Sequence, residues 1–137
     1  MKNFDLVDLN DANKVCATLT EQEHQDVDCL SLENLVFLDV RYYNYTPVAF
    51  VAVKEDLSQG YKDCYIIIAV SPQFRNRGIA TKLVKSAIAW FERSNYDSLF
   101  WPCNVNNVAS NALAQKNNFV FAWQKDEGQS NVYVIDK

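Results

Sequence analysis

A short turn joins an apolar run to an amphipathic segment, and this order constrains the fold more than any other feature of the sequence. The run at residues 65–70 reads Tyr-Ile-Ile-Ile-Ala-Val and has no polar face, which predicts a central strand covered on both sides. Pro72 marks the turn. From Ile79 to Phe91 apolar residues recur at helical spacing, which predicts a helix that begins near Gly78.

The first turn of this predicted helix has the parts of a site for a phosphate or a pyrophosphate. Unpaired N–H groups and the positive end of the helix dipole lie there. Gly78 has no Cβ, so a ligand can approach the backbone, and Arg75 and Arg77 add positive charge. An ordinary turn with two solvated arginines is the alternative, because short glycine motifs often match by chance. The absence of Asp and Glu from residues 64–91 favours the anion site.

Two motifs lie in the second half of the chain. The first follows a strand that ends in valine and reads Arg75-x-x-Gly78-x-Ala80. The second reads Asn107-x-x-Ser110-x-x-Leu113-x-x-Lys116-x-x-Phe119. In order and spacing they resemble the acetyl-CoA signature (Gln/Arg-x-x-Gly-x-Gly/Ala) and the C-terminal motif of the GNAT superfamily of N-acetyltransferases. The resemblance covers residues 61–120, whereas the earlier part matches only in general layout.

The resemblance implies an α/β (α+β) fold, and we expect one N-acetyltransferase-like domain over residues 1–137. Its sheet would be mixed, mostly antiparallel and seven-stranded, with four helices on its two faces. A central parallel pair of strands, Tyr65–Val70 and Leu99–Cys103, would splay apart, and the thioester of acetyl-CoA would lie in the gap.

Apolar periodicity and turn residues predict the elements of this fold. At the N-terminus we expect an edge strand at Phe4–Leu9, then a helix capped by Asn10 or Asp11 that runs to about Gln22, and a second helix over Gln25–Leu32. The further predicted strands cover residues 35–43, 48–53, 62–70 and 98–103, and a closing hairpin pairs 119–123 with 132–135. The further predicted helices cover residues 78–93 and 107–116.

The resemblance implies that three segments hold the co-substrate, acetyl-CoA. Backbone groups of Ile68, Ala69 and Val70 would pair with the pantetheine arm, and an N–H group near Val70 would polarise the thioester carbonyl. The pyrophosphate would bind N–H groups of Arg75, Asn76, Arg77, Gly78, Ile79, Ala80 and Thr81. Polar contacts to the arm would come from Asn104, Asn107 and Ser110. A plain helix cap is the alternative role for Asn107, and the two roles are compatible.

The catalytic base is where the sequence departs from the family. A carboxylate often sits on the central strand of these enzymes, but one such position is Cys64 here. Asp63 is adjacent and is our candidate for the base, although strand alternation turns it to the other face unless a bulge shifts the register.

The catalytic acid is a second departure. The family often has a tyrosine that protonates the leaving thiol, and this chain has Ala114 at that position. Tyr65, Cys103 and Ser110 are the remaining candidates for the acid. Asn118 replaces a usual glycine, and asparagine tolerates the left-handed conformation that a glycine would adopt.

These motifs predict an N-acetyltransferase that moves an acetyl group from acetyl-CoA to a primary amine by direct transfer. The missing tyrosine motivates an alternative, a non-catalytic acyl-CoA-binding regulatory module of the same fold. A phosphate-loop nucleotide binder is a weaker third interpretation, because no Gly-Lys-Ser/Thr follows Gly78.

The charge distribution suggests the partners. Of a net charge of −4, residues 1–63 hold 12 acidic and 5 basic side chains, whereas residues 64–137 hold 5 and 8. An anionic cofactor suits the second half and a cationic acceptor the first, so we expect a small-molecule or peptide amine. The aromatic segment 41–50 could line the acceptor pocket or pack at an edge. The overall acidity argues against nucleic acid as a partner.

Composition also predicts where the protein works. No apolar run is long enough to span a bilayer, and the N-terminus lacks an apolar signal core, so we expect a cytoplasmic protein that does not bind membranes. Four separated cysteines and the single His24 predict reduced thiols and no metal site. The closing hairpin offers an edge that could pair with a second copy, so a homodimer is a further expectation.

Overall fold

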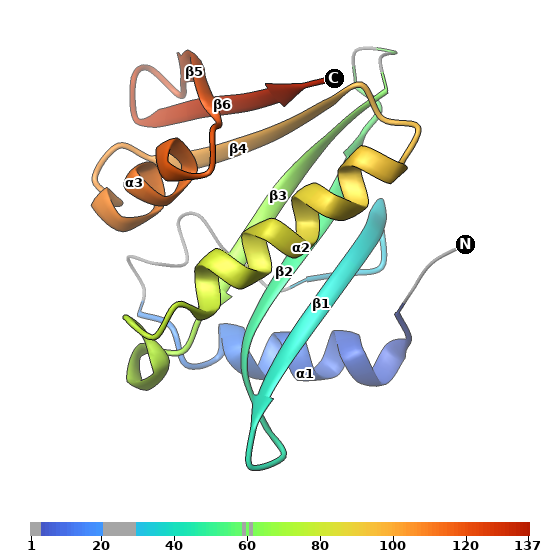
Figure 1. The fold of residues 1–137 in the computed structure, drawn as a ribbon, viewed down its shortest axis with the longest axis vertical. Helices are drawn as coiled ribbons and strands as arrows, with labels where there is room; N and C mark the ends of the chain where they lie inside the picture. The colour runs from blue at the N-terminus through green and yellow to red at the C-terminus, as the bar shows by residue number, and fades with distance from the viewer. Residues whose placement is uncertain (1–3, 21–29, 59, 61) are drawn as a thin grey trace.

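The computed structural model describes residues 4–20, 30–58, 60 and 62–137. Within this part of the chain, six strands form one mixed sheet in the order β1-β2-β3-β4-β6-β5 (Figure 1). Strands β3 and β4 run parallel, and every other neighbouring pair runs antiparallel. The strands are β1 (Leu35–Tyr43), β2 (Thr46–Asp56), β3 (Asp63–Val70), β4 (Ser98–Asn104), β5 (Val120–Lys125) and β6 (Ser130–Asp136).

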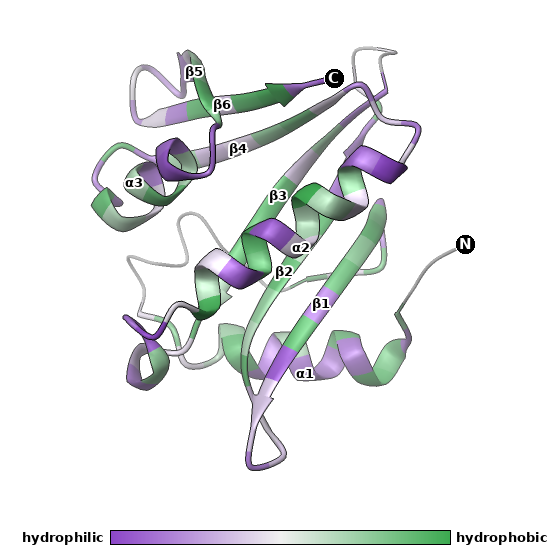
Figure 2. Ribbon diagram, viewed as in Figure 1, coloured by the Kyte–Doolittle hydropathy of each residue, from purple (hydrophilic) through white to green (hydrophobic). Residues whose placement is uncertain are grey.

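Helices lie on both faces of this sheet. Helix α1 (Leu6–Cys16) packs on β1, β2 and β3 from one side. Helix α2 (Ile79–Arg93) packs on the same three strands from the other side, where α3 (Val108–Lys116) packs beside β4 and β5. A single 3₁₀ turn, η2 (Pro72–Phe74), connects β3 to α2. Polar and apolar residues alternate along α2, as an amphipathic helix requires (Figure 2).

Each face of the sheet has its own buried cluster. On the α2 face, Leu83 and Phe91 are fully buried against β2, β3 and β4. On the α1 face, Val15 is fully buried against a cluster that includes Phe50 of β2. Burial of one such side chain contributes about 1.5–3 kcal/mol. The central position of β3 between these clusters confirms the prediction made from its apolar run.

The predicted edge strand at Phe4–Leu9 is wrong, because the chain is helical from Leu6. Asp5 caps this helix, not Asn10 or Asp11, and its side chain accepts from the Asp8 N–H while the Asp8 side chain accepts from the Asp5 N–H. The reciprocal caps fix the helical start, and the buried stripe then has helical spacing. Its members are Leu9, Ala12, Val15 and Cys16.

The predicted total of seven strands and four helices also differs from the structure, which has six strands and three α-helices among its described residues. Helix α1 ends at Cys16, short of Gln22, and the Thr18 hydroxyl donates to the carbonyl of Val15. Most of the predicted helix at Gln25–Leu32 lies outside the described residues, and residues 30–32 are not helical.

The other predicted elements are confirmed with shifts of a few residues at their ends. The hairpin of β1 and β2, the α2 and α3 helices, and the closing hairpin of β5 and β6 all form. Asn118 has a φ of 69°, the left-handed conformation expected there. One irregularity in the β5–β6 register, between Phe121 and Trp123, is a bulge that sets which β5 side chains face each side.

Candidate active site

The parallel strands β3 and β4 pair at one end and separate at the other. Three residue pairs are in register, and the last is Tyr65 with Phe100. Beyond it β3 continues to Val70 and β4 to Asn104 without pairing to each other. The separation leaves backbone groups on two facing strand edges, which is a place where an extended ligand can add as a strand.

A cleft of about 190 Å³ occupies the gap. Its walls come from the open ends of β3 and β4, from the loop before α2 and from the first turns of α3, and Leu19 after α1 borders it as well. Seven predicted co-substrate residues line it: Ile68, Ala69, Val70, Arg75, Ala80, Asn107 and Ser110. Ile66, Ile67, Trp101, Pro102, Cys103, Ala109 and Leu113 also line it.

The loop between β3 and α2 needs its glycine for conformation. Gly78 is the N-cap of α2 with a φ of 79°, a region in which L side chains are strained. A Cβ placed there would meet no atom within 4 Å, so the space above the backbone is open. Gly78 has no side chain to cap the helix, and the first turn of α2 has no side-chain cap on its N–H groups.

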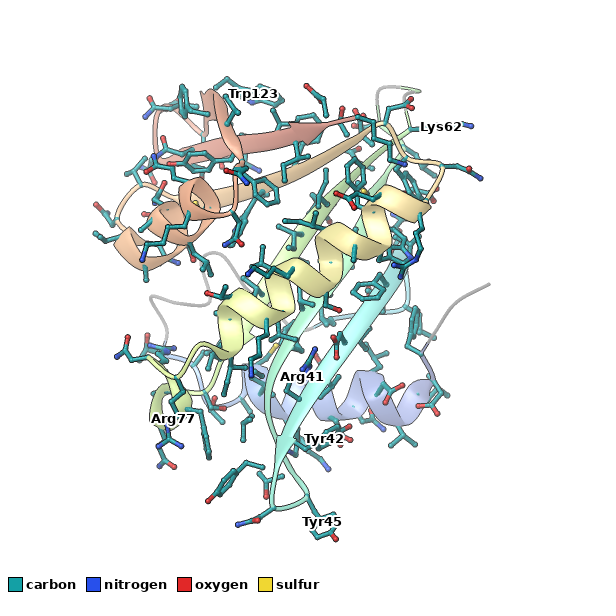
Figure 3. The ribbon with its side chains drawn as sticks, viewed as in Figure 1. Arg41, Tyr42, Tyr45, Lys62, Arg77 and Trp123 are labelled. Atoms are coloured by element: carbon teal, nitrogen blue, oxygen red, sulfur yellow. The ribbon has the colours of Figure 1, made fainter. Side chains whose placement is uncertain are left out.

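The two arginines of this loop lie in different places. Arg75 lines the cleft, and its Nε donates to the carbonyl of Val70 at 3.1 Å. The Arg77 guanidinium lies over the Phe74 ring, 5.1 Å from its centroid, and borders a second hollow. Figure 3 shows Arg77 at the start of α2, near the β1–β2 end of the molecule. The sequence grouped both arginines on one ligand, and the structure separates them.

The second hollow lies between the β1–β2 hairpin and the start of α2. Tyr42 and Tyr43 line it, together with Arg77, Ile79 and others. The Tyr42 hydroxyl donates to Asp11 at 2.7 Å. Tyr45 lies at the hairpin tip and is 99% exposed, so this third aromatic residue lines neither hollow.

Asn107 fills the cap role that the sequence allowed. Its side chain accepts from the Ser110 N–H at 3.1 Å and so begins α3. Asn111 braces the same loop, because its amide donates to the carbonyls of Asn104 and Asn107. Its side-chain oxygen accepts in turn from the Tyr133 hydroxyl at 2.7 Å. These bonds fix the α3 wall of the cleft against β4 and β6.

Two catalytic candidates, Asp63 and Tyr65, lie at the closed end of the strand pair and do not line the cleft, whereas the candidate acids Cys103 and Ser110 do line it. Asp63 and Tyr65 sit two residues apart on β3, on the α1 face, and the β2–β3 register has no shift that would turn Asp63 over. Partial burial, then the charges of Asp56, Asp97 and Asp136, raise the pKa of Asp63. Burial, then the charge of Asp56, raises the pKa of Tyr65, which keeps its proton at neutral pH.

Two positions that the family resemblance singled out, one for the base and one for the acid, cannot serve in those roles here. The Cys64 thiol is fully buried on the α2 face and donates to the carbonyl of Ser98. Burial raises the pKa of Cys64 to about 12, so it is no base at neutral pH. Ala114 is fully buried in the core and offers no proton.

Six predicted co-substrate residues fall outside the cleft lining: Asn76, Arg77, Gly78, Ile79, Thr81 and Asn104. Most belong to the loop and the first turn of α2 at the cleft mouth, while Asn104 caps the next turn by accepting from the Asn106 N–H. The residues that sequence reasoning did not assign to the co-substrate, such as Trp101 and Leu113, are apolar walls. The sequence had placed Trp101 in a predicted strand and Leu113 in the second motif, and the splay of the strands brings both into the cleft lining.

Among the described residues, no group of three His, Cys, Asp or Glu side chains gathers as metal ligands, and none of the described helices is long and apolar enough to cross a membrane. Cys16, Cys64 and Cys103 are buried and form no disulfide with a described residue, and Cys29 lies outside the described residues.

Comparison with known proteins agrees with the fold. The model of the acetyltransferase (GNAT) family matches residues 6–119, and the chain belongs to this family of acyl-transferring enzymes. No curated protein sequence matches the chain as a relative.

Solved structures share the fold at low sequence identity. A ribosomal-protein-alanine N-acetyltransferase from Brucella melitensis has a TM-score of 0.77 and 16% identity, covering 99% of this chain and 98% of its own. An N-acetyltransferase from Staphylococcus aureus Mu50 has a TM-score of 0.74 and 20% identity, covering 97% and 94%. A putative streptothricin acetyltransferase from Bacillus anthracis str. Ames, in complex with acetyl coenzyme A, has a TM-score of 0.64 and 18% identity, covering 79% and 65%.

Proposed function

We propose that this protein transfers an acetyl group from acetyl-CoA to a primary amine by direct attack of the amine on the thioester. The observation that carries the proposal is the cleft that opens where β3 and β4 separate, with the Gly78 loop at its mouth. The Bacillus anthracis structure, whose fold this chain shares, holds acetyl coenzyme A. The cleft is small and mostly apolar, which suits a slender pantetheine arm better than a whole nucleotide.

The chain's own groups fit each part of this ligand. Backbone groups of Ile68 to Val70 are the unpaired strand edge for the pantetheine amides, and an N–H group near Val70 holds the oxygen on which negative charge develops. The uncapped N–H groups from Ile79 to Thr81 and the Arg75 side chain hold the pyrophosphate. These assignments place the thioester toward Tyr65, where the strands begin to pair.

The reaction forms a C–N bond and breaks the C–S bond of the thioester. The amine nitrogen loses a proton, and the departing sulfur gains one. Asp63, with its raised pKa, is our candidate for the proton acceptor, either directly or through water. Tyr65, which stays protonated, is the candidate donor.

A non-catalytic acyl-CoA-binding regulatory module is the second candidate function. Ala114 favours it, because a buried methyl group stands where the family often has its acidic tyrosine. A proton donor typically contributes about 10²–10⁴-fold in rate, so its loss slows transfer without removing the contribution of orientation.

Two measurements separate these functions. Isothermal titration with acetyl-CoA tests binding, and the absence of heat and of any thermal shift at saturating ligand would reject both. Release of free thiol from acetyl-CoA over a panel of amines then tests transfer. We expect steady release with at least one amine, and release with none would leave only the binding module.

The acceptor is proposed to be a small-molecule or peptide amine, consistent with the protein acceptor in the name of the Brucella melitensis enzyme. We propose that the enzyme works in the cytoplasm.

A further inference from the structure

The α1 face of the sheet divides into a covered half and an exposed half. Helix α1 packs on β1, β2 and β3. On the remaining strands large apolar side chains stay open: Val120 is 66% exposed and Trp123 is 49% exposed. Figure 3 shows Trp123 on β5, at the end of the molecule away from the β1–β2 hairpin. Large contiguous patches of exposed apolar surface often mark a site for a ligand or a partner.

Strand register places three aromatic rings together on this half. Tyr65 of β3 pairs with Phe100 of β4, and residues directly opposite each other share a face. The β5 bulge turns Trp123 to the same side, where its ring lies 5.4 Å from that of Phe100. We name Tyr65, Phe100 and Trp123 the aromatic platform. It begins at the last paired residues of β3 and β4, and the cleft opens directly beyond them.

A row of carboxylates borders the platform on the side away from the cleft. Asp56 pairs with Asp63, Asp63 with Ser98, and Ser98 with Asp136, so these four side chains share the α1 face across four strands. Ser98 donates to Asp136 at 2.6 Å. We name Asp56, Asp63 and Asp136 the aspartate row. None of its members forms an ion pair with a described residue within 4.0 Å.

We propose that this surface is the acceptor site and takes an amine with a second, distant positive charge, as in an α,ω-diamine or a polyamine. The inference rests on the proposed acetyl transfer. The reacting amine enters at the closed end of the cleft beside Tyr65 and Asp63, the aliphatic stem lies on the aromatic platform, and the far ammonium group meets the outer members of the aspartate row, Asp56 and Asp136. Rings attract cations and cover aliphatic stems, and carboxylates without an ion pair select positive charge, so charge complementarity identifies the occupant.

The rise of β3 sets the length that an acceptor needs in order to reach the aspartate row. Asp63 lies two residues before Tyr65 and level with Asp56 and Asp136, and extended backbone rises about 3.3 Å per residue, so the row is about 7 Å along the strand from Tyr65. Short diamines cannot span that distance, whereas longer ones can. Monoamines of any length lack the second charge and gain only the contact with the platform.

The test is thiol release from acetyl-CoA with α,ω-diamines from ethylenediamine to dodecanediamine, against n-alkylamines of the same lengths. We expect kcat/KM to peak at one diamine length and to show no such peak for monoamines. The double variant Asp56→Asn and Asp136→Asn, which keeps the hydrogen-bond acceptors, should raise KM for the best diamine by about three- to tenfold and leave the monoamines unchanged. Glu92→Gln, which removes an exposed carboxylate from α2, should change neither.

Trp123→Leu should raise KM for both series, because it removes platform area without removing charge. A flat diamine series, or an unchanged KM in the double variant while thiol release continues, would overturn the inference and leave the proposed function standing. No binding of acetyl-CoA in a titration would remove the proposed function itself. A dimer in light scattering that Trp123→Asp dissociates would show the platform to be an interface between copies, and this also overturns the inference.

Discussion

The two ends of the β3–β4 pair differ in chemistry as much as in geometry. At the paired end, Asp63 and Tyr65 sit on an open face that is acidic and aromatic. At the splayed end, Ile66 to Val70 line an apolar cleft whose mouth is basic and rich in backbone N–H groups. In the proposed function, this pair of strands separates a region for the anionic donor from a region for a cationic acceptor, and the two substrates meet at the junction between them.

The largest expected effect comes from the loop at the splayed end. Gly78→Val forces a β-branched residue into a φ of 79°, and such strain costs on the order of 1–3 kcal/mol. We expect the loop to shift and acetyl-CoA affinity to fall by about tenfold to a hundredfold in a calorimetric titration. Gly60→Val is the matched control, because Gly60 has a φ of 71° with equally open space, and it should leave affinity unchanged.

Charge reversal at Arg75 and at Arg77 tests whether the cleft and the second hollow bind different ligands. Arg75 lines the cleft and Arg77 lies on Phe74 beside the second hollow. Arg75→Glu should weaken acetyl-CoA binding by about two- to fivefold, which is the range for an exposed charged contact, and Arg77→Glu should weaken it less. Equal losses in the two variants would mean that the hollows act as one site.

Asn107 tests whether the α3 wall has a structural role, a binding role or both. Asn107→Ala removes the cap on Ser110 and should lower the free energy of unfolding by about 1 kcal/mol, measured by denaturant melts. Asn107→Ser keeps a cap, so its stability should stay close to that of the wild type. A serine variant with native stability but weaker acetyl-CoA binding would isolate the binding role.

The smallest effect concerns Asp63 at the paired end. Its raised pKa means that the folded state holds the proton more tightly than the unfolded state, so ionisation of Asp63 destabilises the fold as pH rises through that pKa. Asp63→Asn should therefore melt at a higher temperature than the wild type at neutral pH. The difference should vanish below the ordinary value of 3.8, where Asp63 is protonated in both states. A lower melting temperature at neutral pH would contradict this reading of the aspartate row.

Much of the fold could be predicted because its local signals agree. The apolar run of β3, the Gly78 turn and the helical spacing of α2 all point to one arrangement, and the Asn107 cap marked α3. The prediction of an edge strand at the N-terminus was wrong, because Phe4, Leu6 and Leu9 are interspersed with polar residues as in a strand. The capping box of Asp5 and Asp8 decides for a helix.

The site could be predicted only as far as its backbone motif. The splay depends on where pairing of β3 with β4 stops, which is a tertiary property that no spacing in the sequence reports. The Arg77 guanidinium group lies over the ring of Phe74 and away from the cleft lining, and no spacing in the sequence reports that contact. The aromatic platform joins residues that are far apart in the sequence. It depends on the pairing of β3 with β4, of β4 with β6 and of β6 with β5, and on the bulge in β5, so no local pattern in the sequence predicts it.

A crystal structure of the protein with bound CoA tests the central claim most directly. The account predicts that the pantetheine arm lies between the open ends of β3 and β4, with its pyrophosphate on the N–H groups from Arg75 to Thr81 and its sulfur toward Tyr65. CoA bound in the second hollow, or anywhere that leaves the space between those strands vacant, would contradict it.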